Sequence, residues 1–416
     1  MSGRLSRREM IAGAAAVVGA AAVAKLPGDL AAQGATAATE SPAVPADPTK
    51  LQGHPTSALG ARSPFVRPSR TPTGETVGHS LTPLQDLTGS ITPADLHFER
   101  HHAGIPVIDP ARHRLMIHGL VERPLTLTVD ELRRFPQVTR THFIECAGNG
   151  RVAFRDPKPE MTPQRVAGMV STSEWTGVRL ATLFREVGVR PEGKWFLAEG
   201  GDACLMTRSV PMEKAWDDAL IVWAQNGEPL RPAQGYPVRL LLPGWEGNIN
   251  VKWLRRLEVG AAPWMTRWET SKYTDPLPGG KARQFSFVLD AKSIITSPAT
   301  PGVVRARGWH PVQGLAWSGR GRITRVEVST DGGRRWRDAE LLHEPLPKAT
   351  VRFQQMWEWT GGDAVLLSRA TDETGYTQPT RAALLAARGP GTDFHFNPIV
   401  GWRVARDGAI AFHGET

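Results

Sequence analysis

The sequence predicts an α+β protein in which a mixed α/β domain is followed by an immunoglobulin-like β-sandwich. The chain has 416 residues, which exceeds one ordinary domain and suggests two domains plus flanking segments. Helix-start signals and short apolar runs are interspersed over residues 96–275. Period-two alternation and turn signals dominate residues 285–405, which is typical of an all-β domain.

Residues 1–24 are expected to be a twin-arginine signal peptide. Arg7 and Arg8 precede a short run rich in Ala, Val and Gly, and residues 22–24 read A-V-A, which fits a cleavage site. The alternative is a chance Arg pair before a buried helix, but the order of the signals favours export. Such a signal places the folded protein in the periplasm and is often used when a cofactor is inserted beforehand. No later segment is long and apolar enough to span a membrane.

Residues 25–95 are rich in Ala, Pro, Thr, Gly and Ser, and we expect a linker or an extended arm there. In residues 96–275, Thr128 and Glu131 form the pattern of a capping box, so a short helix should begin there and end before Pro136. The apolar runs 219–222 and 240–242 predict buried strands.

Residues 276–280 read PLPGG and are the expected boundary between the two domains. Beyond them, residues 323–328 alternate apolar and polar side chains. The turn signal at residues 331–333 (DGG) then predicts a hairpin with residues 335–337, and residues 364–370 predict another strand. This spacing suits an immunoglobulin-like sandwich that lacks the disulfide pair.

The chain has two cysteines, Cys146 and Cys204. Neither lies in a C-x-x-C-H motif, and two thiols are too few for an iron–sulfur cluster or a Cys-rich zinc site, so we expect no haem or Fe–S in this chain. In an oxidising compartment the two could form a disulfide, or one could bind a metal.

The formal net charge is +9, from 50 Lys and Arg against 41 Asp and Glu. It fits a soluble surface, anionic substrates or an acidic protein partner. No basic run with interleaved aromatics is present, so nucleic acid is not an expected partner.

Cys146 ends an apolar run and precedes Ala-Gly-Asn-Gly, which predicts a strand that ends in a tight turn. Arg151 follows closely, and a nearby guanidinium should lower the pKa of the thiol. The alternative is a buried structural cysteine. We interpret Cys204 as structural, because nothing near it in the sequence suggests a site.

Arg100, His101 and His102 form a cationic cluster. Consecutive side chains on a strand point apart, so at most one of the two histidines should face a site, and both could be surface residues. A soft thiolate together with convergent Arg side chains suits an anion processed at a metal.

These stretches resemble the sulfite oxidase family of molybdenum–pterin enzymes. The resemblance covers residues 80–405 and rests on five segments in the family's order: F-x-R-x-H at 98–102, C-A-G-N at 146–149, G-Y-P-V-R at 235–239, V-K-W at 251–253, and Tyr273. The molybdenum subunits of bacterial sulfane and sulfite dehydrogenases are the most similar in local sequence, over residues 96–102, 243–248 and 269–274.

The resemblance implies one molybdenum–molybdopterin per chain, with Cys146 as the protein ligand of the metal. It implies that the substrate anion is bound by Arg100, Arg151 and Tyr273. The residues that it implies for cofactor binding are His102, Asp202, Gln234, Arg239, Asn250 and Lys252, with Arg239 and Lys252 on the pterin phosphate and Asn250 offering its backbone.

The chain also departs from the family pattern. Gly150 and Arg151 stand where Arg-Arg is common, Gln234 stands where His is common, and no Arg near Asn397 matches the one near the C-terminus of the animal enzymes. A less crowded cationic pocket makes a longer or protein-bound sulfur chain a candidate substrate beside sulfite.

The resulting hypothesis is a periplasmic two-electron oxidation of sulfane sulfur or sulfite. The electrons would pass to a c-type cytochrome, because this chain has no C-x-x-C-H motif and no ligands for an iron–sulfur cluster. The resemblance implies a homodimer formed through the sandwich, or a two-plus-two heterotetramer with the cytochrome subunit. The alternatives are a direct sulfite dehydrogenase that uses free cytochrome c, a methionine sulfoxide reductase-like enzyme, and a non-catalytic periplasmic binding module.

Overall fold

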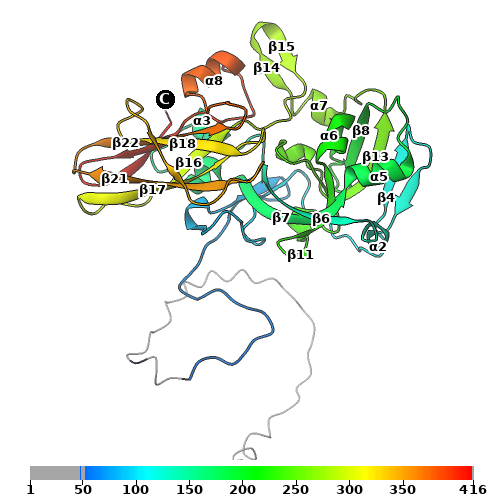
Figure 1. The fold of residues 1–416 in the computed structure, drawn as a ribbon, viewed down its shortest axis with the longest axis horizontal. Coiled ribbons are helices and arrows are strands. Elements are labelled where there is room, and N and C mark those ends of the chain that lie inside the picture. The colour runs from blue at the N-terminus through cyan, green and yellow to red at the C-terminus, as the bar shows by residue number, and fades with distance from the viewer. Residues whose placement is uncertain (1–46, 48–51, 415–416) are drawn as a thin grey trace, which may run out of the picture. The chain divides into compact units, whose positions relative to one another are not determined.

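The computed structural model describes residue 47 and residues 52–414. The expected signal peptide over residues 1–24 lies outside the described residues. The chain divides into two units, residues 1–67 and residues 68–416. The described part of the first unit contains turns and bends and no helix or strand. All elements below belong to the second unit (Figure 1).

A small antiparallel sheet opens the second unit. Its strands are β1 (Thr71–Gly74), β2 (Gly78–Leu81) and β3 (Glu99–His101), in the order β1-β2-β3. The 3-10 helix η2 (Leu84–Asp86) follows β2 and buries Leu84. The expected arm over residues 25–95 therefore contains regular structure from residue 71 onward. β2 pairs with both β1 and β3, and the pairing with the distant β3 is not evident from the local composition.

The mixed α/β half contains two five-stranded sheets. The first has the order β11-β10-β7-β6 with β12 also paired to β10, and the second has the order β5-β4-β13-β8-β9, in which β4 and β13 are parallel. The strands are β4 (Leu115–Gly119), β5 (Leu125–Leu127), β6 (Gln137–Glu145), β7 (Val170–Arg179), β8 (Trp195–Gly200), β9 (Thr207–Pro211), β10 (Leu220–Gln225), β11 (Glu228–Pro229), β12 (Arg239–Leu241) and β13 (Leu254–Gly260).

Short helices connect these strands. They are α2 (Val129–Leu132), α3 (Arg151–Arg155), α4 (Pro163–Ala167), α5 (Leu180–Val187), α6 (Met212–Asp217) and α7 (Arg267–Thr270), with 3-10 turns η3 (Pro232–Gln234) and η4 (Gly247–Ile249). The capping box at the start of α2 is confirmed, because Thr128 Oγ1 accepts from the Glu131 amide while the Glu131 carboxylate accepts from the Thr128 amide. The predicted strands at 219–222 and 240–242 are β10 and β12.

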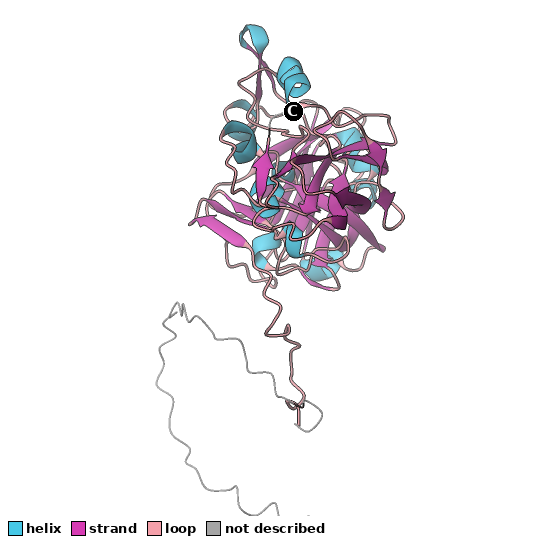
Figure 2. Ribbon diagram, turned by 90° about the vertical axis from the view of Figure 1, so that its left-hand side faces the viewer, coloured by secondary structure: helices cyan, strands magenta, loops and turns pink. Residues whose placement is uncertain are grey.

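Residues 275–283 fold as a hairpin of β14 (Asp275–Leu277), η5 (Pro278–Gly280) and β15 (Lys281–Arg283). The expected domain boundary at residues 276–280 lies within this paired hairpin. Figure 2 shows how short the helices of the described chain are beside its strands.

The C-terminal half is the predicted sandwich of two sheets. One has the order β16-β17-β21-β20 and the other β19-β18-β22-β23-β24. The strands are β16 (Lys292–Ser297), β17 (Gly308–Trp317), β18 (Ile323–Ser329), β19 (Arg337–Asp338), β20 (Glu340–Leu341), β21 (Val351–Trp359), β22 (Ala364–Asp372), β23 (Gly401–Val404) and β24 (Ile410–His413), and α8 (Arg381–Arg388) lies between β22 and β23. The predicted hairpin after Ser329 is confirmed, since β18 and β19 pair antiparallel.

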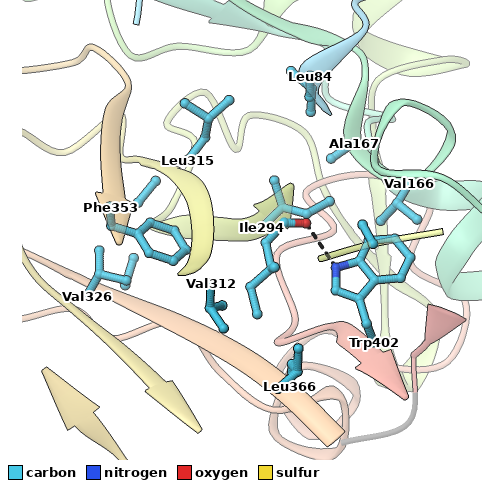
Figure 3. Packing of buried hydrophobic residues seen from close by; sticks show 14 of the residues in the cluster. Leu84, Val166, Ala167, Ile294, Val312, Leu315, Val326, Phe353, Leu366 and Trp402 are labelled. Carbon is cyan, nitrogen blue, oxygen red and sulfur yellow. Dashed lines mark hydrogen bonds between the residues drawn. The ribbon is translucent and has the colours of Figure 1, made fainter. Parts of the chain in front are cut away.

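One hydrophobic core fills the sandwich and continues beyond it. Phe353, Leu366 and Trp402 from its strands are buried together with Leu84 of η2 and Val166 of α4 (Figure 3). Each such side chain contributes about 1.5–3 kcal/mol when it is fully buried. The sandwich is therefore packed against segments of the first half. No helix in the described residues is both long and apolar enough to cross a membrane.

Candidate active site

The Cys146 turn, residues 146–150, lies at the end of β6. The Cys146 amide donates to the Met169 carbonyl at 3.0 Å, and the Asn149 amide donates back to the Cys146 carbonyl at 2.9 Å. Gly150 has φ +96°, a conformation that a side chain strongly disfavours, and it starts α3. The predicted strand-and-turn geometry is thus present.

Two cavities meet at the Cys146 turn. The inner cavity has about 660 Å³ of empty space and the outer cavity, which is more extensive, has about 1520 Å³. Four side chains line both: Arg100, His102, Cys146 and Tyr273. Of the other predicted site residues, Arg151 lines the outer cavity, and the inner cavity is lined by Asp202, Gln234, Arg239, Asn250 and Lys252. The fold thus brings every predicted site residue to one of two adjoining spaces.

Two cations of the inner cavity are held by carbonyl oxygens. Arg239 is buried and donates from Nη1 to the Gln234 carbonyl and from Nη2 to the Asn250 carbonyl, both at 3.0 Å. Lys252 Nζ donates to the carbonyls of Arg100 at 3.1 Å and Ala233 at 3.0 Å. Among the described residues neither cation lies within ion-pair distance of a carboxylate, although the charges of Glu99 and Asp202 act on Lys252 from farther away.

Burial changes the pKa of both cations. It lowers the pKa of Arg239 to about 9. Burial, followed by the charge of Arg239, lowers the pKa of Lys252 to about 7. An anion placed between the two would reverse these shifts, because a nearby opposite charge stabilises the charged form.

Several buried polar atoms beside the inner cavity have no hydrogen-bond partner. They are Arg239 Nε, His97 Nε2, and both amide atoms of Asn248. Buried polar groups are rarely left unsatisfied, so these atoms mark where a polar ligand would be held. His97 and Asn248 were not among the predicted site residues, although both lie inside the stretches that carried the resemblance.

Asn250 and Gln234 contribute mainly to the shape of the inner cavity. Asn250 Oδ1 accepts from the Leu242 amide at 2.6 Å, and its Nδ2 donates to the Glu246 carbonyl at 3.0 Å. Its side chain therefore braces the loop around η4, and only its backbone remains for a ligand. Gln234 Nε2 donates to the Phe98 carbonyl at 2.8 Å, which ties η3 to β3.

Cys204 lies at the wall of the outer cavity, contrary to the expectation that nothing around it resembles a site. Its thiol donates to Asp202 Oδ2 at 2.8 Å, and burial followed by this hydrogen bond raises its pKa to about 12. The sequence did offer one indication that Cys204 lies near the site, because Asp202, two residues before it, is a predicted cofactor-binding residue. Both cysteines are free thiols, so the disulfide alternative is wrong.

His101 and His102 both line the inner cavity, so the expectation that at most one would do so is wrong. The reason is that β3 ends at His101, and strand alternation no longer governs His102. His102 Nε2 and Tyr273 Oη are hydrogen-bonded at 2.9 Å. Burial, followed by the charge of Arg100, lowers the pKa of His102 to about 3, and burial raises the pKa of Tyr273. Near neutral pH, both side chains are therefore uncharged.

The pKa of the Cys146 thiol is raised, whereas the sequence predicted a lowered value. Burial is the largest cause and outweighs the Gly148 amide, Arg100 and Arg151, which all favour the thiolate. The guanidinium groups are present as expected, but desolvation of the buried thiolate raises the pKa more than these groups lower it. A bound cation such as a metal ion would change this balance.

The outer cavity is lined by cations and by no Asp or Glu. The basic residues are Arg100, Arg151, Arg165, Arg267 and Lys272. Arg151 donates from Nη2 and Nε to the Asp393 carbonyl at 2.7 and 3.0 Å, and it lies over the Phe394 ring. Because all the formal charges share one sign, the space is suited to anions.

Comparison with protein families gives two matches. Residues 102–268 match the oxidoreductase molybdopterin binding domain, and residues 283–400 match the Mo-co oxidoreductase dimerisation domain. The first range holds most of the predicted site, and the second holds most of the sandwich.

Individual relatives agree with this result. Sulfite oxidase of Gallus gallus is 30% identical over 369 residues, which cover 83% of this chain and 78% of the relative. Nitrate reductase [NADH] of Ulva prolifera is 30% identical over 351 residues, and the chain spans 40% of its length. The solved structure of the sulfane dehydrogenase SoxCD from Paracoccus pantotrophus matches with a TM-score of 0.84 and 44% identity over 88% of this chain and 98% of that chain.

Proposed function

The chain belongs to the sulfite oxidase family of molybdopterin oxidoreductases, and from this premise we propose that it oxidises sulfane sulfur or sulfite by two electrons. We propose further that it does so in the periplasm and passes the electrons to a c-type cytochrome. The observation that carries the proposal is the meeting of two different cavities at Cys146. The inner cavity suits a polar ligand with an anionic end, and the outer cavity attracts anions.

The residues of the inner cavity fit a molybdopterin. Arg239 and Lys252, which have no carboxylate partner in the described chain, would hold its phosphate. The unpartnered Asn248 amide and His97 Nε2 offer hydrogen bonds of the kind that a pterin ring requires. Cys146 Sγ, at the junction with the outer cavity, would be the metal ligand, since soft thiolates suit redox metals.

Molybdenum, when bound, supplies the two-electron redox chemistry. The protein's own groups bind and orient the substrate. Arg100 and Arg151 would hold a sulfur oxyanion by charge-assisted hydrogen bonds. The Tyr273 hydroxyl, which stays protonated, and its partner His102 would bind an oxygen of the substrate without adding charge.

The outer cavity supports an anionic substrate larger than sulfite. Its empty space of about 1520 Å³, which includes the solvent at its mouth, is more than twice the 660 Å³ of the inner cavity, and its formal charges are all positive. A longer sulfur chain, free or attached to a carrier protein, would fit it. Methionine sulfoxide is uncharged and gains less from this field, so a methionine sulfoxide reductase is the weaker alternative.

The electron acceptor and the assembly are inferred from the chain's chemistry. Neither cysteine belongs to a C-x-x-C-H motif, so the electrons must leave to another protein. The net positive charge would favour docking to an acidic cytochrome. The match to a dimerisation domain supports a homodimer or a two-plus-two heterotetramer. The periplasmic location rests on Arg7, Arg8 and the run that follows them.

The decisive experiment is the molybdenum content of wild type, Cys146→Ser and Cys204→Ser. The chains are exported with their own leader from a host that makes molybdopterin, and they are purified from the periplasmic fraction. We expect about one metal per wild-type chain and per Cys204→Ser chain, and strong depletion in Cys146→Ser, because Cys146 lines both cavities whereas Cys204 lines the outer one alone.

A folded wild type without molybdenum would contradict the enzymatic proposal and favour the binding module. Failure to reach the periplasm would contradict export. Assays with sulfite, with thiosulfate plus partner proteins, and with methionine sulfoxide then decide among the substrates, and free cytochrome c as acceptor tests the direct sulfite dehydrogenase.

A further inference from the structure

Glu145, the residue before Cys146, is a buried carboxylate whose oxygens accept three hydrogen bonds from side chains. Its Oε1 accepts from Asn149 Nδ2 and from Lys292 Nζ, both at 2.9 Å. Its Oε2 accepts from Trp317 Nε1 at 2.7 Å. Asn149 belongs to the Cys146 turn itself, but Lys292 and Trp317 belong to the sandwich, where they pair across β16 and β17.

The sandwich half holds the Cys146 turn at two further points. Lys292 Nζ also donates to the Asn149 carbonyl at 3.1 Å. The amide of His395, in the segment before β23, donates to the Ala147 carbonyl at 2.8 Å. Residues 145, 147 and 149 are thus tied to the sandwich half, while Cys146 between them lines both cavities.

The opposite side of the turn is closed by backbone. A Cβ on Gly247, at the start of η4, would come within 2.9 Å of the Glu145 carbonyl oxygen and 3.3 Å of Cys146 Cα. Any side chain at residue 247 would therefore press against the turn, and only a glycine allows η4 to approach it this closely. The position of the turn is fixed by contact on one side and by hydrogen bonds to the sandwich half on the other.

We propose that Glu145, Lys292 and Trp317 form a clamp by which the sandwich domain positions Cys146. This gives the sandwich a role in the site that is separate from dimerisation. The three are positioning residues, because they act through the backbone of the Cys146 turn. The inference deepens the proposed function, since it rests on Cys146 as the metal ligand.

The chemistry of the clamp requires a carboxylate. All three side chains that reach Glu145 are donors, and only a carboxylate offers acceptors on both of its oxygens. In Glu145→Gln, the new amide nitrogen must face either Trp317 Nε1 or the donors of Lys292 and Asn149. Every rotamer therefore leaves at least two donors facing each other in a buried space.

Trp317→Phe tests the clamp with a matched control. It removes the donor to Glu145 and keeps a ring in the core. Trp402→Phe is the control, because Trp402 is also buried in the sandwich (Figure 3) and its Nε1 donates to the Ile295 carbonyl at 2.9 Å and not to Glu145. Both variants lose one buried hydrogen bond, so a purely structural role predicts equal effects.

The readout is amide hydrogen exchange, by mass spectrometry, of a peptide covering residues 146–154 in the full chain. Loss of a hydrogen bond to a charged group should accelerate local opening of this turn about tenfold in Trp317→Phe. Trp402→Phe should leave the peptide's exchange unchanged. Equal exchange rates in the two variants would overturn the clamp.

A double variant adds a rescue. Trp317→Phe should partly reverse the fast exchange of Glu145→Gln, because it removes one of the opposed donors and the two changes are coupled. Additive effects would contradict the proposal. If Glu145→Gln does not fold, the comparison of the two Trp variants still decides the outcome.

The loaded enzyme gives an independent check. We expect faster loss of molybdenum on dilution, and an altered sulfur-to-metal absorption band, in Trp317→Phe and not in Trp402→Phe. If the folded wild type carried no molybdenum, the proposed function would fail. The clamp would still be judged by hydrogen exchange, so the two failures are distinguishable.

Discussion

At the scale of single residues, the site depends on charges and donors that the protein itself leaves partly unmatched. Arg239 and Lys252 are held by carbonyl dipoles, and Arg239 Nε has no partner. Such an arrangement costs stability in the absence of an anion and is repaid when one is bound. The identity of these residues could be predicted from the sequence, but their burial could not.

Lys252 predicts a pH dependence of stability in the cofactor-free protein. Its folded pKa of about 7 lies below the ordinary value of 10.5, so between these values the unfolded chain binds a proton that the folded chain does not. Stability should therefore rise with pH above about 7. Melting temperatures of wild type and Lys252→Met, measured from about pH 7 to about pH 9, should show a steeper rise in wild type.

Lys281→Met, at an exposed position on β15, should keep the wild-type slope. Loading with cofactor should reduce the slope, because a phosphate keeps Lys252 charged. If Lys252→Met and wild type have the same slope, the low pKa is contradicted.

We expect Arg151 to contribute to binding of the substrate anion. Arg151→Gln should raise KM for a sulfur oxyanion about tenfold with a smaller change in kcat, because a charge-assisted hydrogen bond to the substrate is lost. The side chain is 40% exposed, and solvent screening limits the effect. Arg155→Gln is the control, since Arg155 is on the same helix and lines neither cavity; equal KM changes would rule out this role.

At the scale of elements, some helices and strands are specified by adjacent residues, and others depend on contacts between distant segments. The capping box of α2 and the β18–β19 hairpin depend on residues that are close in the sequence, so both could be predicted. The sheet of β1, β2 and β3 could not be predicted, because it forms only when residues 71–81 come together with residues 99–101, which are distant in the sequence. The same limit applies to the two histidines, whose orientation depends on where β3 ends.

A glycine contact links the loop after β12 to the end of β17. A Cβ on Gly319 would come within 2.0 Å of the Gly244 carbonyl oxygen and 2.6 Å of the Leu289 carbonyl oxygen. Gly319→Ala should therefore lower the free energy of unfolding by about 1–3 kcal/mol, as in other overpacked sites. Urea unfolding would measure the loss.

Gly362→Ala is the matched control, since a Cβ there would meet nothing within 4 Å and its φ is not positive. It should leave stability nearly unchanged. Similar stability of the two Ala variants would mean that the Gly244–Gly319 contact relaxes at little cost.

At the scale of the whole molecule, the net charge of +9 and the cation-lined outer cavity act in the same direction. For an anionic substrate, kcat/KM should fall roughly tenfold between low and high ionic strength, because salt screens exposed charges. The paired substitution Arg267→Gln and Lys272→Gln should flatten this dependence.

The matched control is Lys281→Gln with Arg283→Gln, which removes the same charge from the exposed hairpin strand β15. Initial rates across a salt series would compare the two. If both double variants have equal salt slopes, overall charge rather than the outer cavity attracts the substrate.

The sequence by itself determined the family, the order of the two domains and the residue types that meet at the site. These follow from the short stretches around Cys146, Arg239 and Lys252, because the chemistry of each side chain there can be recognised from its residue type alone. Tertiary structure alone decided the raised pKa of Cys146, the place of Cys204 at the cavity wall and the clamp on Glu145 from the sandwich. The reason is that burial and hydrogen bonding between residues more than a hundred positions apart arise only when the chain is packed.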